Sequence, residues 1–431
     1  MNLPKEQFCA LLVSVYKGGA TNRAVAEEHL QELALLSETY GVKVLHKILC
    51  PIRQYSAALY VTEGKLEELV EAAKLHQANL VIFDDEISPS QQRNLEKAFG
   101  ISVIDRTEVI LGVFGQRAQT KEARLQIELA QVKYEAPRLK RLWTHLSRQH
   151  GSGGSSGSGG GYTKGEGEKQ IEIDRRILKR KIELLQKEID EVKANREMQR
   201  QARQKSEIPV FGIIGYTNAG KSTLLNALTG AGVFVEDKLF ATLDTTTRKF
   251  TLPNNQSVLL IDTVGFIRKL PHLLVAAFKS TLEEAFQSDI LLHLIDASNP
   301  MAEEQAETTF EVLKQLNVEN RSIITVLNKI DACEGCQERV QRLCLKYPRV
   351  VKVSALHRTG FEDLLEAMVE ELAKQRHVAL LRIPQSEYAV VSEIMRSGHI
   401  LNKEYEGNDV LLRVDLPNAI MNRLKKYERT Q

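Results

Sequence analysis

Short runs of β-branched and aliphatic residues alternate with amphipathic stretches over the first hundred residues. The apolar runs at 8–15, 42–49, 80–83 and 101–104 have the length and composition of strands, and the stretches between them have helical spacing. Strict alternation of strand and helix predicts right-handed crossovers and a small parallel sheet covered by helices. No phosphate-binding loop occurs in this part of the sequence.

From about residue 121 the pattern becomes helical, and a second helical stretch covers 168–205. Apolar residues in the second stretch recur at alternating spacings of four and three, which is the seam of a coiled coil. The glycine- and serine-rich segment 151–161 separates the two helices, so we predict an antiparallel hairpin with a glycine-rich tip. The seam residues are Leu178, Ile182, Leu185, Ile189 and Val192.

The tip of this predicted hairpin has an unusual charge pattern, because no acidic residue occurs between positions 136 and 164. Basic side chains release counterions when they neutralise phosphates, and flat side chains stack on unpaired bases. We therefore predict RNA binding here, and a solvated linker is the alternative. The candidate RNA-binding residues are Arg138, Lys140, Arg141, Trp143, His145, Arg148, Tyr162 and Lys164.

A second type of pattern starts at the apolar strand predicted for 208–214, which leads directly into the motif GYTNAGKS and a helix from about 223. This is the context of a phosphate loop, whose backbone N–H groups curl around phosphates at a helix N-terminus. Lys221 can reach the β- and γ-phosphates, and the Ser222 hydroxyl can ligate magnesium. The loop comprises Gly215, Tyr216, Thr217, Asn218, Ala219, Gly220, Lys221 and Ser222.

Two further segments have the spacing expected of nucleotide-sensing switches. An apolar strand at 259–261 ends in the second switch, where a carboxylate can hold magnesium through water and a glycine N–H can sense the γ-phosphate. In the first switch we favour Thr242 as a magnesium ligand, with the threonines at 245–247 as alternatives. The first switch is Phe240, Ala241, Thr242, Leu243 and Asp244, and the second begins with Asp262, Thr263, Val264 and Gly265.

Base recognition is predicted at the ends of two later strands, 323–327 and 350–353. The Asp331 carboxylate can accept hydrogen bonds from N1–H and the 2-amino group of guanine, donors that adenine does not present in this arrangement. The sequence therefore predicts a magnesium-dependent GTPase in which Lys221, Thr242 and Gly265 serve catalysis. The base-binding segments are Asn328, Lys329, Ile330 and Asp331, followed by Ser354, Ala355 and Leu356.

The residue after the glycine of the second switch is Phe266, where many small GTPases carry glutamine. Phenylalanine can neither orient nor deprotonate water, so we expect slow intrinsic hydrolysis that a partner stimulates. We also predict that Asn218 helps to bind a potassium ion that acts like an arginine finger.

Composition and charge argue against several classes of protein. The 58 basic and 56 acidic residues give a net charge of +2, so bulk charge predicts no nucleic-acid binder, and DNA binding is not expected. No run of about 18 apolar residues occurs, and we expect a cytoplasmic protein, with peripheral membrane attachment left open. Five scattered cysteines predict free thiols, including the pair Cys333 and Cys336, and no metal site.

These patterns together predict a multidomain α/β protein. The expected units are an α/β domain at 1–120, a helical hairpin at 121–205 with its tip at 151–167, a P-loop GTPase domain at 206–374 and a small α+β domain at 375–431. In the last unit we expect a strand, a helix, two strands around the turn at 406–409 and a helix from about 418.

The chain resembles the HflX family of ribosome-associated GTPases, in the Obg-HflX group. The residues that carry the resemblance are GYTNAGKSTLLNAL, LFATLDTTTR, DTVGFI and NKID, with IFDDEISPSQQRNLE, VIDRTEVIL, LQIELAQVKYEAPRL and WTHLSRQ upstream. The resemblance implies binding of the large ribosomal subunit and its RNA by the hairpin, ribosome-stimulated GTP hydrolysis, and rescue or splitting of stalled ribosomes. We also expect a monomer. At the tip the chain has GYTKGEGE, with Lys164 where the family has arginine.

Two other functions compete with this interpretation. One is a GTP-dependent switch or scaffold that binds proteins and no RNA, which the acid-free tip disfavours. The other is an ATP-dependent RNA remodeller, which the guanine-specific Asp331 disfavours.

Overall fold

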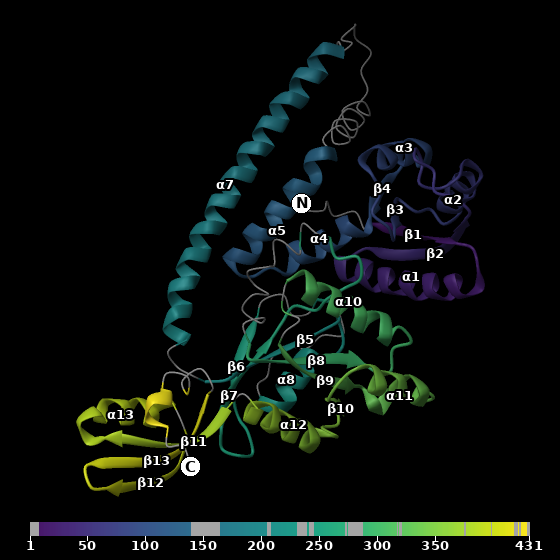
Figure 1. The fold of residues 1–431 in the computed structure, drawn as a ribbon. Coiled ribbons are helices and arrows are strands. Elements are labelled where there is room, and N and C mark those ends of the chain that lie inside the picture. The colour runs from purple at the N-terminus through teal and green to yellow at the C-terminus, as the bar shows by residue number, and fades with distance from the viewer. Residues whose placement is uncertain are drawn as a thin grey trace.

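The computed structural model is a multidomain α/β protein built on three separate β-sheets (Figure 1). A four-stranded sheet belongs to the N-terminal part, a six-stranded sheet to the middle and a three-stranded sheet to the C-terminal part. The structure describes residues 8–138, 164–204, 208–230, 239–240, 245–271, 274, 288–316, 318, 321–374, 376–397, 399–417, 421 and 424–428.

The N-terminal sheet has the strand order β2-β1-β3-β4, and every neighbouring pair is parallel, as predicted. Helix boundaries follow local chemistry: the Ser88 side chain caps α3 in a reciprocal pair with Gln91, and the Asp105 side chain caps α4. The elements are β1 (Cys9–Lys17), α1 (Ala20–Tyr40), β2 (Lys43–Ile52), α2 (Glu63–Leu75), β3 (Leu80–Phe83), α3 (Pro89–Phe99), β4 (Ser102–Asp105) and α4 (Arg106–Arg117).

The predicted hairpin is formed by α5 (Lys121–Glu135), the short η1 (Ala136–Arg138) and the long α7 (Lys164–Gln204), which run side by side in opposite directions (Figure 1). The seam is confirmed, because Leu185 and Ile189 of α7 are buried with Leu125, Leu129 and Val132 of α5. Most of the predicted tip lies outside the described residues.

The central sheet has the order β10-β9-β8-β5-β7-β6, parallel except for the pair β6 and β7. The carboxyl ends of its parallel strands therefore meet at one edge, where ligands bind in open α/β sheets. The elements are β5 (Val210–Gly215), α8 (Lys221–Thr229), β6 (Thr246–Thr251), β7 (Ser257–Asp262), β8 (Ile290–Asp296), α10 (Ala302–Gln315), β9 (Ser322–Asn328), η2 (Ile330–Ala332), α11 (Gln337–Lys346), β10 (Val350–Lys352) and α12 (Phe361–Lys374).

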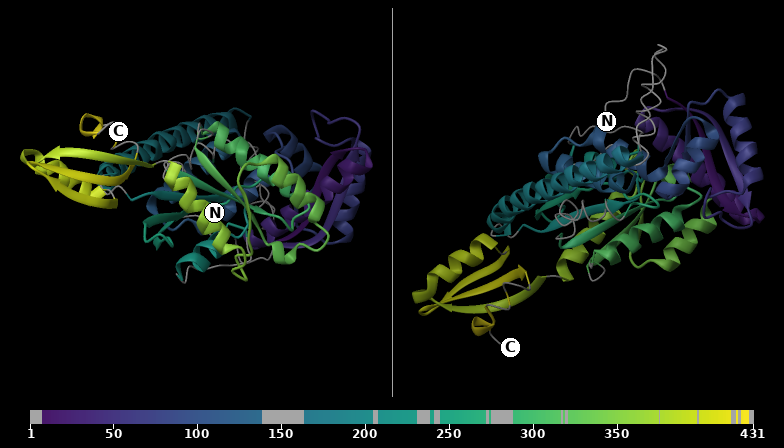
Figure 2. Two further views of the ribbon diagram at one scale, coloured as in Figure 1. Left: turned by 60° about the horizontal axis from the view of Figure 1, so that its bottom comes forward. Right: turned by 90° about the horizontal axis from the view of Figure 1, so that it is seen from above.

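The C-terminal sheet is antiparallel in the order β11-β13-β12 and lies at the end of the molecule opposite the N-terminal sheet (Figure 2). The predicted succession of strand, helix and two strands is confirmed, and most of the helix predicted from about 418 lies outside the described residues. The elements are β11 (Arg376–Pro384), η3 (Gln385–Glu387), α13 (Tyr388–Ser397), β12 (His399–Glu406), β13 (Asp409–Pro417) and η4 (Lys425–Tyr427).

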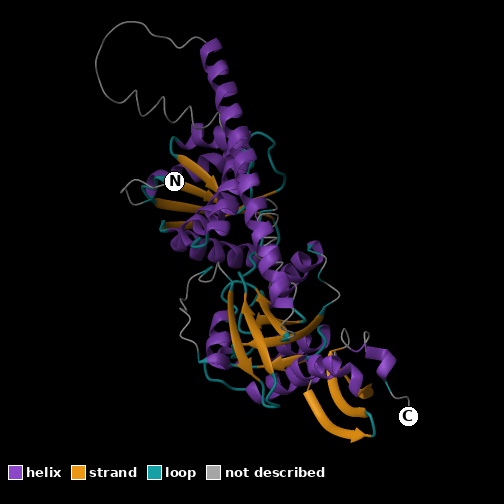
Figure 3. Cartoon of the chain, turned by 90° about the vertical axis from the view of Figure 1, so that its left-hand side faces the viewer, coloured by secondary structure: helices purple, strands orange, loops and turns teal. Residues whose placement is uncertain are grey.

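The N-terminal unit and the central unit share a hydrophobic core. Phe114 of α4 packs against Phe240, with ring centroids 4.4 Å apart, and both belong to a cluster that includes Tyr216 and Phe266. Helix α7 extends from the region of the N-terminal sheet toward the central sheet (Figure 3). In the described part of the chain, no helix is both long enough and apolar enough to cross a lipid bilayer.

Candidate functional site

The loop from Gly215 to Ser222 lies at the carboxyl end of β5, the most common position for a ligand loop in such a sheet. Its backbone depends on glycine at two points. A Cβ on Gly215 would lie 2.3 Å from the Leu294 carbonyl oxygen, and one on Gly220 would lie 2.3 Å from Asn328 Nδ2. Both residues also have φ values in the left-handed range, which glycine adopts without strain.

Lys221 begins α8 and is buried beneath the loop. Its ammonium group donates to the carbonyl oxygens of Gly215, at 3.2 Å, and Tyr216, at 2.7 Å. Burial lowers the pKa of Lys221 to about 8, and the charge of Asp262 acts in the opposite direction. The ammonium therefore already points at the loop that would surround a phosphate, and an anion there would favour its charged form.

This pKa predicts a pH dependence of nucleotide affinity. The pKa of Lys221 is about 8 without nucleotide, and bound phosphates would raise it. Nucleotide affinity should therefore be full below about pH 8 and fall as pH rises above that value, by up to about tenfold per pH unit. The measurement is the dissociation constant of a fluorescent GDP between pH 7 and 9. Lys221→Arg, whose guanidinium stays charged, should show a flatter profile, and a wild-type constant independent of pH would contradict the assignment.

The Ser222 hydroxyl donates to Asp262 Oδ2 at 2.6 Å, so the loop and the end of β7 bring a hydroxyl and a carboxylate together. Hard oxygen ligands of this type suit Mg²⁺, and Asp262 is completely buried. The donor set therefore fits the predicted magnesium site. The third predicted ligand, Thr242, lies outside the described residues together with Ala241, Leu243 and Asp244.

The second switch is held against the phosphate loop by its backbone. Phe266 N donates to Gly215 O at 3.0 Å, and Thr217 N donates to Phe266 O at 2.7 Å. A Cβ on Gly265 would lie 2.8 Å from Thr217 Cα and 2.9 Å from Lys221 Nζ, so no larger residue fits there. The Phe266 ring is buried in the shared core, which leaves no side chain at that position to orient water.

Asn328 anchors the loops of the site to one another. Its amide nitrogen donates to Ala219 O at 2.8 Å, and its oxygen accepts from Ala355 N at 3.0 Å. It therefore fixes the phosphate loop, the end of β9 and the segment 354–356 relative to one another. Ser354 and Ala355 are buried, whereas Leu356 is 71% exposed.

Asp331 lies on η2 at the surface, where a carboxylate is accessible to a base. A hydrogen bond from Ser354, together with the charges of His357 and Lys329, holds the pKa of Asp331 below its usual value. The group is therefore an acceptor at neutral pH, as guanine recognition requires. Lys329 is tied to Asp296 at 2.8 Å, which joins the ends of β8 and β9.

The structure adds a buried polar cluster between the N-terminal unit and the second switch, which we call the interdomain cluster: Glu32, Asp84, Arg106, Tyr216 and Arg268. Asp84 Oδ1 accepts from Arg106 Nη1 at 2.9 Å, and Asp84 Oδ2 accepts from Arg268 Nη2 at 2.7 Å. Burial would raise the pKa of Asp84, but Arg106, Arg268 and Lys269 lower it. Asp84 therefore stays ionised in the interior.

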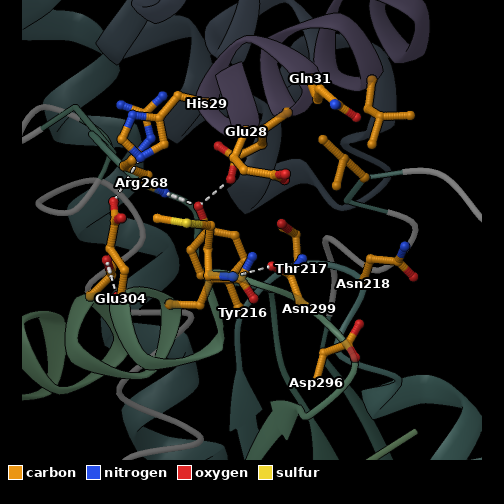
Figure 4. Close-up of a pocket in the computed structure, with 16 residues that line it drawn as sticks. Glu28, His29, Gln31, Tyr216, Thr217, Asn218, Arg268, Asp296, Asn299 and Glu304 are labelled. Atoms are coloured by element: carbon orange, nitrogen blue, oxygen red, sulfur yellow. Dashed lines mark hydrogen bonds and ion pairs between the residues drawn. The ribbon is translucent and has the colours of Figure 1, made fainter. Parts of the chain in front are cut away.

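Tyr216 connects this cluster to the phosphate loop. Its hydroxyl donates to Glu32 Oε2 at 2.6 Å and accepts from Arg268 N at 2.7 Å (Figure 4). Glu32 also pairs with Arg106. Sequence reasoning missed this cluster; the acidic pair that follows β3 and the basic pair that follows DTVGFI were its available signals.

A pocket of about 190 Å³ lies between α1 and the phosphate loop. Figure 4 shows Thr217 and Asn218 on the loop side, facing the α1 side chains. Asn218 adopts a left-handed backbone conformation, φ 60°. Carboxylates of Glu28, Glu32, Asp296 and Glu304 line the pocket together with Arg268 and His29. All of these carboxylates except that of Glu28 pair with a basic side chain.

Two predictions made for the tip and the cysteines require correction. Arg138 is 7% exposed: it lies over the Tyr134 ring, donates to Gln92 Oε1 and Ile87 O, and is 3.5 Å from Asp105. In this structure its guanidinium supports the base of the hairpin and is not exposed to a nucleic acid. The remaining candidates lie outside the described residues or, for Lys164, have no described side chain: Lys140, Arg141, Trp143, His145, Arg148 and Tyr162.

The expectation that all cysteines are free thiols is wrong for one pair, because Cys333 and Cys336 form a disulfide. A turn at Gly335, φ 74°, brings the two residues together, and short spacing alone does not reveal this. Cys9, Cys50 and Cys344 are free.

Among the residues with described positions, no group of three or more His, Cys, Asp or Glu side chains could hold a metal ion.

The fold and this site define a GTP-hydrolysing enzyme of the P-loop class. Three family models match successive parts of the chain: GTP-binding GTPase N-terminal at 27–115, GTP-binding GTPase Middle Region at 117–203 and 50S ribosome-binding GTPase at 210–329. The chain belongs to the HflX family of GTPases, since it is 46% identical over 420 residues to GTPase HflX of Chlamydia pneumoniae.

That alignment covers 97% of this chain and 88% of the relative. GTPase HflX of Escherichia coli K12 is 41% identical over 403 residues, which cover 93% of this chain and 92% of the relative. The solved structure of SsGBP with GDP is 28% identical, with a TM-score of 0.48, and covers 85% of this chain and 98% of that chain.

Proposed function

We propose that this GTPase binds the large ribosomal subunit in a nucleotide-dependent way and acts in the rescue or splitting of stalled ribosomes. The observation that carries the proposal is the match of residues 210–329 to the family model described as a 50S ribosome-binding GTPase. The hairpin formed by α5 and α7 supports it, because it extends away from the central sheet (Figure 1). The protein would act in the cytoplasm as a monomer.

The residues of the site have separate roles in this proposal. The phosphate loop would cradle the phosphates, Ser222, Thr242 and Asp262 would hold Mg²⁺, and Asp331 would select guanine. When bound, Mg²⁺ neutralises charge on the transferred phosphoryl group. Lys221 would position the phosphates, and the Gly265 N–H would sense the γ-phosphate. We also propose that the chain consists of four structural units, with boundaries at residues 120, 205 and 374.

The interdomain cluster would link nucleotide state to the N-terminal unit. Gly265 packs against Lys221 and Thr217, where a γ-phosphate would have to be accommodated. GTP binding would therefore move the second switch, and Arg268 with it, away from Asp84. A ligand that prefers one arrangement of the switch would then also favour the matching position of the N-terminal unit. The free energy of this coupling is the same in both directions.

Sedimentation with purified ribosomal subunits tests the proposal. We expect co-sedimentation with the large subunit in a non-hydrolysable GTP analogue, weaker binding in GDP and a loss of binding as salt rises. Reversing the charges of Lys140, Arg141 and Arg148 to glutamate should weaken binding about tenfold or more. The matched control reverses three exposed lysines of the N-terminal sheet unit, Lys43, Lys47 and Lys74. Binding to neither subunit in any nucleotide state would overturn the proposal.

We also propose that Asn218 helps to bind a K⁺ ion beside the phosphates. Asn218 belongs to the phosphate loop and lines a pocket that also contains the Glu28 carboxylate, which would provide a counter-charge for a cation. Intrinsic hydrolysis should then be several-fold faster in potassium than in sodium at equal ionic strength, and Asn218→Ala should abolish the difference. Equal rates in the two salts would remove this part of the proposal.

A further inference from the structure

A CxxC pair, Cys333 and Cys336, follows the guanine-recognition segment and is not part of the nucleotide site described above. Cys333 comes directly after η2, which carries Asp331, and Cys336 comes directly before α11. Their Cα atoms are 5.3 Å apart, within the range of natural disulfides. The pair therefore closes a ring between the base-binding segment and the next helix.

The surroundings connect this ring to the nucleotide site on both sides. Cys333 Sγ lies 3.5 Å from Ala297 O, directly after Asp296, the partner of Lys329. Arg339 of α11 donates to Ala297 O and Ser298 O, both at 3.1 Å. The conformation of residues 329–336 and the end of β8 are thus fixed by the same few contacts.

The two thiols differ in access, as a reactive pair requires. Cys336 is 5% exposed, whereas Cys333 is only partly buried and can meet a small oxidant. Cys344 of α11 packs against the same apolar cluster as Cys333 and is a free thiol.

We propose that Cys333 and Cys336 form a reversible redox site that controls how tightly the enzyme holds guanine nucleotides. Hydrogen peroxide transfers one oxygen atom to the Cys333 sulfur, which becomes a sulfenic acid, and the other oxygen leaves as water. Cys336 then attacks that sulfur and a second water leaves, so that two thiols and one peroxide yield a disulfide and two waters. A dithiol reductant reverses the step by thiol–disulfide exchange.

The disulfide form holds the base-binding segment in the conformation that presents Asp331, because a closed ring has fewer conformations than an open loop. The inference rests on the proposed contact between Asp331 and guanine. Since that contact is equal for GTP and GDP, oxidation slows release of both nucleotides by about three- to tenfold and leaves the single-turnover rate of hydrolysis unchanged.

The experiment uses the full chain without ribosomes and measures release of a fluorescent GDP after treatment with hydrogen peroxide or dithiothreitol. Peptide mapping should find the 333–336 disulfide only after peroxide, and release should be slower in that state and recover with dithiothreitol. The Cys333→Ser/Cys336→Ser variant should be insensitive, and the matched control Cys344→Ser should behave as wild type. Equal release rates in the two states, or no 333–336 disulfide after peroxide, would overturn the inference.

One further variant separates this inference from the proposal on which it rests. Asp331→Ala should release GDP much faster in both redox states if Asp331 contacts guanine. If this variant released GDP at the wild-type rate, the role of Asp331 would be refuted. The comparison of oxidised and reduced wild-type chain is a separate measurement that tests the redox effect. Failure to bind ribosomes affects neither result.

Discussion

Replacing Asp331 by asparagine is expected to change the preferred substrate from GTP to xanthosine triphosphate. In the proposed site the carboxylate would accept two hydrogen bonds from guanine, and an amide cannot accept both, so one donor of the base would lose its partner. Xanthine carries an oxygen where guanine carries the 2-amino group, and the asparagine amide can donate to it. We expect kcat/KM for GTP to fall about 10²- to 10⁴-fold and that for xanthosine triphosphate to rise correspondingly.

The control for this change is Glu334→Gln, which makes the same acid-to-amide substitution at an exposed position in the same loop. It should leave both kcat/KM values within about a factor of two, since surface substitutions rarely exceed 0.5 kcal/mol. Unfolding of Asp331→Asn should be unchanged, because Asp331 lies at the surface. If the variant kept GTP activity within threefold of wild type, another residue would have to select the base.

Asp84→Ala is expected to cause the largest loss of stability among single changes between the two units. Asp84 is 2% exposed and pairs with Arg106 and Arg268, which are 1% and 7% exposed. Removing the carboxylate leaves two buried guanidinium groups without their shared counterion, which costs about 3–5 kcal/mol. The measurement is the midpoint of the first transition in urea unfolding, because a chain with several domains can unfold in more than one step.

The neighbouring residue Asp85 provides the matched control. It pairs with Lys269, whose side chain is 41% exposed, so Asp85→Ala should cost less than about 1 kcal/mol. The variant Asp84→Ala/Arg268→Ala should lose less than the sum of the single changes, because it removes the guanidinium that Asp84→Ala deprives of its carboxylate, whereas Arg106 keeps Glu32. Equal costs for Asp84→Ala and Asp85→Ala would show that the cluster is not buried in solution.

The same variant tests the link between the N-terminal unit and the second switch. If Asp84 holds Arg268 in the arrangement that packs Gly265 against Lys221, its removal should favour GTP over GDP. We expect the ratio of GTP to GDP affinity to rise about 5- to 100-fold, the range of coupling free energies between sites. An unchanged ratio in a folded variant would mean that the cluster only stabilises the protein.

The elements of the fold could be predicted from the sequence because each is encoded locally. The apolar run at 80–83 became β3 without change, and the seam from Leu178 to Val192 became the face of α7 that packs on α5. The phosphate loop, the second switch and the Asp331 segment were found because each is a short run of residues at the end of a strand, and parallel strands bring such ends together.

Contacts between distant residues were decided by the tertiary structure alone. Arg138 has the charge of an RNA contact, but packing onto Tyr134 and Asp105 makes it a buried support. The interdomain cluster joins residues up to 184 positions apart, and no local pattern specifies which charge meets which. The sequence by itself determined the class of enzyme and the nucleotide chemistry, because these need only local motifs. The coupling of the second switch to the N-terminal unit depends on which surfaces pack together, and that was decided only by the folded structure.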